Sequence, residues 1–378
     1  VFTAALREAA QAAAGQRLHL PGQTPDAAAP TAQAMAEAAC TLDLLFEFPF
    51  LAQTPMEPLN ATARVGREGV EVWLGTQAPL DTQRAIAKLT GLPAERIQLH
   101  LLPAGGGFGR RLEHDWVLEA VRVAQALPGR AVQLLWPRER ELRAGYYRPA
   151  GAVRARLALN AQQAIRGLRV DLAGPSIAEH SGLTNADGLP PGIDWSASMG
   201  WWNQPYALPA PDLRWTRVDA GIPVGYWRSV AYSQNSFVLE HLLDLAAQRA
   251  GRSPLELRRE LLAADARALA FLNALTDAAG WHAPLPAGCT RGLAISAANG
   301  SLSGHVVELE RRGARGFRLQ RITAAIDCGR AFDPDAVLAQ LLGGTQFGLN
   351  AALQGEITLD EQGRLQQRHF HDYPLLRL

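Results

Sequence analysis

The spacing of apolar residues along the first half of the chain changes repeatedly between two periods. Alternation of apolar and polar residues predicts strands at 41–48, 70–74, 96–102 and 131–136. Apolar residues three to four positions apart predict short amphipathic helices at 82–89 and 113–127. Because strands and helices follow one another in turn, we expect a mixed α/β layer here rather than an all-α or all-β domain.

The second half of the chain shows longer helical patterns. Helices are predicted at 234–249, 254–264, 266–279 and 334–349. Strands are predicted at 305–311 and 317–327, with further strand pairs turning at 160–163 and 361–363. Residues 173–225 are rich in Gly, Pro, Asn and Trp, which predicts a long, ordered loop region.

The N-terminal residues differ from the rest of the chain. Residues 2–14 are Ala-rich and predict a helix, whereas 20–34 predict a linker. A chain of 378 residues is long enough for two principal domains. We therefore expect an α+β or mixed α/β fold, with mixed sheets flanked by helices, divided into 1–39, 40–240 and 241–378.

Composition narrows the possible partners. The formal net charge is only +1, so no general attraction to nucleic acid or to an anionic membrane is expected. Three distant cysteines, Cys40, Cys289 and Cys328, cannot supply the ligands of an iron–sulfur cluster or a structural zinc. No apolar run suits a membrane helix and no signal peptide is visible. Because the chain begins at Val1, the sequence leaves the location of the protein open between cytoplasm and periplasm.

One glycine-rich segment stands between a predicted strand and a predicted helix: Gly105-Gly106-Gly107-Phe108-Gly109-Arg110-Arg111. Glycines allow close backbone approach to a ligand, and successive amides before a helix favour anions. Arginines beside them suit phosphate. The string fits neither GxGxxG nor GxxxxGK[ST], which disfavours a Rossmann or P-loop site. A tight turn without a ligand remains the alternative.

GGGFGRR resembles the glycine loop with which molybdenum hydroxylases of the xanthine dehydrogenase/aldehyde oxidoreductase superfamily hold their pterin cofactor. Further segments resemble that family in the same order: Pro55–Pro58, Gly75–Gln77, Tyr147–Pro149, Gly225–Val230, and Ile326–Gly329 with Gln340–Gly344. The strings GRR, PMEPLNATA, WRSV and FHDYPLLR are most similar to isoquinoline 1-oxidoreductase beta subunits. Roughly residues 40–378 are covered, as a fragment of the molybdopterin-binding large subunit.

The resemblance implies a site made of several loops. It makes 40–240 a first molybdopterin-binding domain and 241–378 a second, C-terminally incomplete one. The implied cofactor-binding residues are Gly105, Gly106, Gly107, Phe108, Gly109, Arg110, Arg111, Arg228, Ser229, Val230 and Gln340. The implied substrate pocket contains Glu57, Arg148 and Trp227. The cofactor would be molybdopterin, in its cytosine dinucleotide form, whose sulfurs hold the molybdenum without protein ligands.

The same resemblance implies the chemistry. Such enzymes hydroxylate an N-heterocycle or an aldehyde with oxygen from water, and a glutamate acts as the base. The family's GQG triplet does not occur here, and its glutamate is expected beyond Leu378, so we expect this chain alone to be inactive. Because the three cysteines cannot build an electron exit, a partner subunit with [2Fe–2S] clusters is implied.

Several of these residues also have a purely structural interpretation. Glu57 could bind a backbone amide or an arginine, and Arg148 and Arg228 could stack on aromatic rings. Gln340 could be an ordinary polar helix residue. His369 and His371 alternate as metal ligands do, but no third ligand is evident.

Two other function classes stay open. One is a binding or assembly protein that has no cofactor but retains the cofactor-binding loops. The other is a different nucleotide-binding enzyme that uses GGGFGRR for a diphosphate, although carboxylates for Mg²⁺ and an acid for ribose are not evident.

Overall fold

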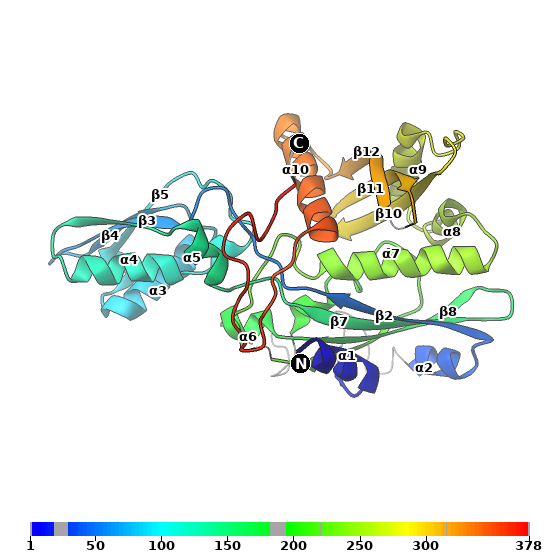
Figure 1. Ribbon diagram of the computed structural model, residues 1–378, viewed down its shortest axis with the longest axis horizontal. Coiled ribbons are helices and arrows are strands. Elements are labelled where there is room, and N and C mark those ends of the chain that lie inside the picture. The colour runs from blue at the N-terminus through cyan, green and yellow to red at the C-terminus, as the bar shows by residue number, and fades with distance from the viewer. Residues whose placement is uncertain (1, 19–28, 182–193, 220, 315, 377–378) are drawn as a thin grey trace.

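Three sheets organise the chain in the computed structural model, which describes residues 2–18, 29–181, 194–219, 221–314 and 316–376 (Figure 1). Helices flank each sheet. The expected fold class, mixed sheets flanked by helices, is confirmed.

The largest sheet has five strands in the order β1-β9-β8-β7-β2. Its strands are β1 (Gln16–Arg17), β9 (Asp212–Arg217), β8 (Ile165–Gly174), β7 (Gly151–Leu159) and β2 (Cys40–Phe48). Neighbours are antiparallel except for β8 and β9. Helices α1 (Phe2–Ala12) and α2 (Ala29–Ala36) cover one face, and α7 (Tyr232–Arg249) covers the other (Figure 1).

Helix α7 lies between this sheet and a second, three-stranded antiparallel sheet. The second sheet contains β10 (Cys289–Ala298), β11 (Ser301–Arg312) and β12 (Gly316–Asp327). One core joins apolar side chains of both sheets and of α7, among them Val153, Leu157, Leu239, Leu243, Leu293 and Val306. The region from β7 to β11 is therefore held by one continuous core.

Three further helices follow α7. They are α8 (Pro254–Leu261), α9 (Ala266–Ala279) and α10 (Pro334–Leu353). Each begins at a side chain that caps the helix: Ser253, which forms a capping box with Glu256, then Asp265 and Asp333. Helix α10 stands beside β12 at the top of Figure 1, and none of its residues is buried.

A four-stranded sheet forms the smaller part of the molecule, at the left of Figure 1. Its order is β5 (Ile97–Leu101), β4 (Val70–Leu74), β3 (Asn60–Val65) and β6 (Ala131–Leu135). Helices α3 (Pro79–Thr90) and α4 (Asp115–Gln125) pack against it with their own core. The short helices α5 (Arg138–Arg143) and α6 (Ile177–Ser181) follow in the chain.

Most of the predicted elements are present, but three predictions were wrong. No strand pair flanks the predicted turn at 361–363, where only an isolated bridge joins Leu359 to Leu365. Part of the predicted linker is helical, because residues 29–34 belong to α2. Part of the predicted loop region 173–225 is a strand, since β9 pairs with β8. Residues 19–28 and 182–193, which carry the rest of these predictions, lie outside the described residues.

Besides β9, three strands in the described residues were not predicted: the two-residue β1, and the longer β3 and β10. Strand β3 has the sequence NATARV and β10 has CTRGLAISAA. Both are rich in small residues with weak strand preference, so their alternation is hard to recognise. Pairing with neighbouring strands, β4 and β6 for β3 and β11 for β10, makes up for this weak local preference.

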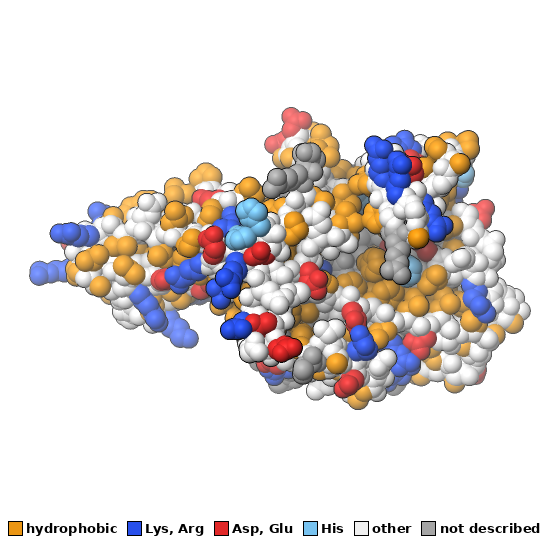
Figure 2. Space-filling view, in the orientation of Figure 1, with side chains coloured by type: hydrophobic (Ala, Val, Ile, Leu, Met, Phe, Trp, Pro, Cys, Tyr) orange, Lys and Arg blue, Asp and Glu red, His pale blue; other side chains and the backbone are white. Residues whose placement is uncertain are grey.

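The expected division of the chain stays a prediction. The boundary after residue 240 falls within α7, and the large core contains residues from both sides of it. Within the described ranges, no helix is both long and apolar enough to cross a bilayer. Figure 2 shows acidic and basic side chains interspersed over this face, with basic ones gathered at the outer end of the four-stranded part.

Candidate functional site

The glycine loop runs from the end of β5 to the start of α4 and has an unusual backbone. Gly106, Phe108 and Gly109 have φ values of +96°, +53° and +100°. A Cβ on Gly109 would lie 2.0 Å from the carbonyl oxygen of Tyr226. Gly109 is therefore required both by its conformation and by the close approach of a second segment.

Three successive amides of this loop point to a ligand. Within the described part of the chain, the N–H groups of Gly106, Gly107 and Phe108 donate to no other group. All three residues are partly accessible. Adjacent backbone N–H groups in a loop of alternating handedness form a concave anion site. The backbone of the loop therefore leaves three adjacent donors without a partner among the described residues, and anion binding by this loop stays a prediction.

Two side chains from other segments hold the loop open. Glu57 Oε2 accepts from Gly105 N at 2.7 Å, and Gln77 Oε1 accepts from Gly109 N at 3.0 Å. A Cβ on Gly107 would lie 2.4 Å from Gln77 Oε1. Since these contacts leave no room for larger residues, the loop shape depends on its glycines.

The Glu57 carboxylate has several partners within the protein, although its side chain is 38% exposed. Its carboxylate also accepts from Asn60 Nδ2 at 3.0 Å and from Arg111 Nη2 at 2.7 Å. Burial alone would raise the pKa of Glu57, but the bonds from Gly105, Asn60 and Arg111 lower it below its ordinary value. Glu57 therefore supports the glycine loop as a carboxylate, and its predicted place in a substrate pocket stays a prediction.

The prediction that the two arginines face a phosphate was wrong for both side chains, because neither is exposed. Arg110 binds Asp115 through two bonds of 2.9 and 2.6 Å. Arg111 donates to the carbonyl oxygens of Gly106 and Gly75 at 2.8 and 3.1 Å. The two guanidinium groups stabilise the loop from beneath.

A second segment, residues 226–230, crosses beside the glycine loop. Gln53 Nε2 donates to Tyr226 O at 2.8 Å, and Trp227 Nε1 donates to Ala52 O at 3.2 Å. Ser229 and Val230 have φ values of +76° and +50°. Positive φ values place both residues in the left-handed region of the backbone, which is costly for residues with a side chain and most costly for a β-branched one such as Val230. Backbone strain of this kind is common at functional sites.

Helix α10 brings the third segment. Arg228 Nη2 donates to Gln340 O at 2.9 Å and to Gln340 Oε1 at 3.0 Å. A Cβ on Gly344 would lie 3.3 Å from Arg228 Nη2, so the glycine lets the guanidinium rest on the helix. Burial lowers the pKa of Arg228 from its ordinary value, but the group stays a cation at neutral pH.

The three segments meet in space. Besides the Tyr226–Gly109 and Arg228–Gln340 contacts, Phe347 of α10 stacks on Trp227 and touches Phe108, with ring centroids 4.5 and 4.8 Å apart. The structure therefore brings together the glycine loop, the 226–230 segment and the middle of α10, as the sequence predicted.

Arg148 lies behind this meeting point. It is 5% exposed, donates to Pro49 O at 2.9 Å and lies 5.6 Å from the ring centre of Trp227. Burial lowers the pKa of Arg148 to about 10. The prediction that Arg148 faces substrate was wrong for this structure, since its guanidinium is enclosed and bonded internally.

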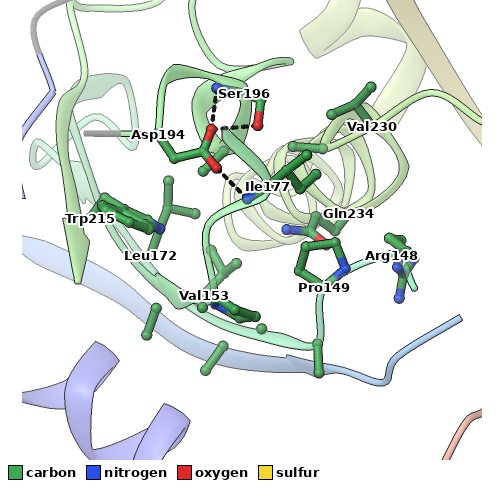
Figure 3. A pocket seen from close by; sticks show the side chains of 18 residues that line it. Arg148, Pro149, Val153, Leu172, Ile177, Asp194, Ser196, Trp215, Val230 and Gln234 are labelled. Carbon is green, nitrogen blue, oxygen red and sulfur yellow. Dashed lines mark hydrogen bonds between the residues drawn. The ribbon is translucent and has the colours of Figure 1, made fainter. Parts of the chain in front are cut away.

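A small cavity of about 40 Å³ adjoins Arg148 (Figure 3). Asp194 on its wall accepts from Ile177 N at 2.7 Å and from Ser196 N at 2.9 Å. Val153, Leu172 and Trp215 provide apolar walls. The cavity has room for only a few water molecules, so it is not the cofactor site.

No group of three or more His, Cys, Asp or Glu side chains that could hold a metal occurs among the described residues. His369 and His371 lie with their Nδ1 atoms 3.2 Å apart on the surface.

The arrangement of these loops and the fold together define a class of cofactor-binding protein. A family model described as a molybdopterin cofactor-binding domain matches residues 20–262, and a second one with the same description matches 300–378. The chain therefore belongs to the molybdopterin cofactor-binding domain family.

Individual relatives agree with this assignment. The chain is 32% identical to isoquinoline 1-oxidoreductase subunit beta of Brevundimonas diminuta, over 86% of this chain and 42% of that protein. It is 27% identical to the membrane-bound aldehyde dehydrogenase (pyrroloquinoline-quinone) of Gluconacetobacter polyoxogenes, over 92% and 48%. The chain spans about half the length of these curated relatives, and the predicted resemblance is confirmed.

The fold is also that of quinoline 2-oxidoreductase from Pseudomonas putida 86. The TM-score is 0.75 at 15% identity, and the match covers 92% of this chain and 69% of that one. Several curated relatives are named as subunits of larger assemblies.

Sequence reasoning missed two residues that join the segments. Gln53 is 2% exposed and also donates to Tyr146 O at 2.5 Å. Phe347 is an apolar residue in a helix that is apolar on several faces. No local pattern distinguishes either residue, because their partners lie far away in the sequence.

Proposed function

We propose that this chain holds a molybdopterin cofactor for the oxidation of an N-heterocycle or an aldehyde by a larger protein. The observation that carries the proposal is the row of three unpaired amides, Gly106 to Phe108, beside Arg228 and Gln340. When bound, the cofactor supplies the two-electron chemistry that hydroxylates carbon with oxygen from water.

The residues divide the binding task by chemistry. The unpaired amides suit a phosphate or another anionic group, since backbone N–H groups bind anions without adding a titratable side chain. Arg228, which is partly accessible, adds one cationic donor. Gln340, which is exposed, adds one amide group. Dispersed donors of this kind suit a large, polar ligand with a diphosphate, and we propose the cytosine dinucleotide form.

We further propose a partner subunit that carries [2Fe–2S] clusters. The three cysteines of this chain are single thiols, distributed over the large sheet, β10 and the end of β12. Electrons released by the oxidation need a path to an acceptor, and iron–sulfur clusters in a second subunit would supply it.

The test is to express the complete coding sequence in a bacterial host that makes the cofactor. Molybdenum would be measured by mass spectrometry, the nucleotide after acid hydrolysis, and activity by dye reduction with N-heterocycles and aldehydes. We expect molybdenum, CMP and turnover. A protein with neither metal nor pterin would support a cofactor-free role, and tight binding of a Mg²⁺–nucleotide instead would support the nucleotide-binding alternative.

Two alanine variants make the test specific to the loop. Gly107→Ala places a Cβ 2.4 Å from Gln77 Oε1, so either the loop must shift or the Gln77 amide must leave the Gly109 N–H that it holds. We expect it to lose most of the bound molybdenum. Gly66→Ala is the matched control, since a Cβ there meets nothing within 4 Å. Equal metal content in both variants would contradict a cofactor site at this loop.

A further inference from the structure

Phe347 occupies a place between the two loops of the candidate site. Its ring lies 4.8 Å from that of Phe108 and 4.5 Å from that of Trp227. Among the described residues, no ring contact joins Phe108 directly to Trp227. Phe347 is thus the aromatic link between the glycine loop and the 226–230 segment.

The rest of α10 offers little else to fix these loops. None of its residues is buried, so the helix is placed by a few specific contacts. Gln340, Gly344 and Phe347 are spaced by four and three positions and share one face of the helix. That face contacts Arg228 at all three positions, and Phe347 also contacts both aromatic residues.

Phe108 adds a second constraint. It has a φ of +53°, a conformation that is costly for an aromatic residue. A Cβ on Gly106 would lie 2.8 Å from Phe108 Cε2, so the Phe108 ring folds back over its own loop. A partner on the outer side of that ring stabilises this conformation, and Phe347 is that partner.

We propose that Phe347 is a positioning residue that holds the glycine loop and the 226–230 segment in register. With Phe347 in place, the unpaired amides of Gly106 to Phe108 and the guanidinium of Arg228 act on one ligand together. The identity of that ligand rests on the proposed function, whereas the coupling of the two loops does not.

The first experiment measures cofactor release from the complete protein for three variants. Phe347→Ala removes both ring contacts, and each is an aromatic pair, so we expect release about tenfold faster. Phe347→Tyr keeps the ring and should stay near the wild-type rate. Leu342→Ala, on an exposed part of the same helix (55% exposed), is the matched control and should leave the rate unchanged.

The second experiment does not depend on the cofactor. A double-mutant cycle between Phe108→Leu and Trp227→Phe is measured by urea unfolding, once in the native background and once with Phe347→Ala. In the native background, we expect the effect of Phe108→Leu on the unfolding equilibrium constant to change by about threefold or more when Trp227→Phe is also present. With Phe347→Ala in place, we expect this coupling between the two residues to be lost.

The outcomes separate this proposal from the proposed function. Unchanged cofactor release in Phe347→Ala, or a rate in Phe347→Tyr as fast as that in Phe347→Ala, would overturn the positioning role. A complete protein without molybdenum would overturn the proposed function alone. In that case the double-mutant cycle decides: lost coupling supports the positioning role, and coupling that persists without Phe347 overturns it.

Discussion

Helices α7 and α10 are similar in length but are held in opposite ways. Of the 18 residues of α7, nine are buried between two sheets, whereas none of the 20 residues of α10 is. Yet both carry a part of the site, since α7 begins directly after the 226–230 segment and α10 provides Gln340. One part of the site is therefore supported by a core and the other by individual polar and aromatic contacts.

Because of this difference, mutations in α7 and in α10 should have different consequences. Stability in α7 comes from a closed core, so damage there unfolds the protein. In α10 the contacts are few and partly exposed, so damage there moves the site while the fold persists. The following predictions test this contrast, from the largest expected effect to the smallest.

The largest effect is expected where α8 packs on α7. Arg258 is fully buried and binds Glu240 of α7 with bonds of 3.0 and 2.8 Å, while Tyr206 donates to the same carboxylate at 2.6 Å. Burial raises the pKa of Glu240 against the opposing effect of Arg258. Arg258→Ala leaves a buried carboxylate without its cation, and we expect a loss of about 3–5 kcal/mol in the free energy of unfolding.

Urea unfolding of Arg258→Ala and of the triple variant Arg258→Met/Glu240→Leu/Tyr206→Phe measures this effect. The triple variant removes both charges and the hydroxyl that binds Glu240, so it should be far closer to wild type. If both variants were equally unstable, the loss would arise from packing and not from an unpaired charge.

A smaller effect is expected from the polar contact that holds α10 on β11. Thr345 Oγ1 donates to Leu341 O at 2.8 Å and lies 2.8 Å from His305 Nε2, so it accepts from the histidine. Thr345→Val leaves this imidazole N–H without a partner, which costs about 1–3 kcal/mol. We also expect a lower molybdenum content because Gln340 shifts with the helix. Thr345→Ser keeps the hydroxyl and should restore both; equal loss in Ser and Val would rule out the hydrogen bond as the cause.

The same contrast explains what could be predicted from the sequence. Helix α7 and the strands β4 and β7 follow from apolar periodicity, because their burial imposes that pattern. The glycine loop was recognisable because close backbone approach excludes side chains, as at Gly109. These features leave a local signature in the sequence.

Other features have no local signature. Arg110 and Arg111 were assigned to a phosphate, yet Asp115 and the carbonyl oxygens of the loop enclose them. Strand β9 is defined by parallel pairing with β8, which no short pattern reports. Phe347 becomes significant only through partners more than a hundred positions away. Such relations depend on tertiary contacts, so only the structure reveals them.

A still smaller effect is expected from acid. Burial lowers the pKa of His305 below its ordinary value. As the pH falls below about 6.5, the unfolded chain takes up a proton that the folded protein does not, so the stability held by neutral His305 is lost. Burial raises the pKa of Glu113 to about 7, which acts in the opposite direction over the same range.

The measurement therefore compares wild type with His305→Gln between pH 7.5 and 5.5. Gln keeps a donor toward Thr345 but does not titrate. In the wild type, we expect the rate of backbone hydrogen exchange in α10 to rise relative to that in α7 as the pH falls. In His305→Gln, we expect the ratio of the two rates to stay constant over the same range. An equal rise in both proteins would mean that another group is responsible.

The smallest effect is expected on the outer side of α10, where one matched pair of substitutions tests the whole contrast. Leu242 of α7 is completely buried, and Leu342 of α10 is 55% exposed. Leu242→Ala leaves a cavity between two sheets and should cost about 2–5 kcal/mol in urea unfolding. Leu342→Ala removes a side chain that already meets water, so the change should stay within about 0.5 kcal/mol. The substitution is the same, and both residues lie in helices, so helix propensity cancels. A cost at Leu342 comparable to that at Leu242 would mean that the outer face of α10 is covered in the protein, and that its exposed apolar side chains belong to an interface.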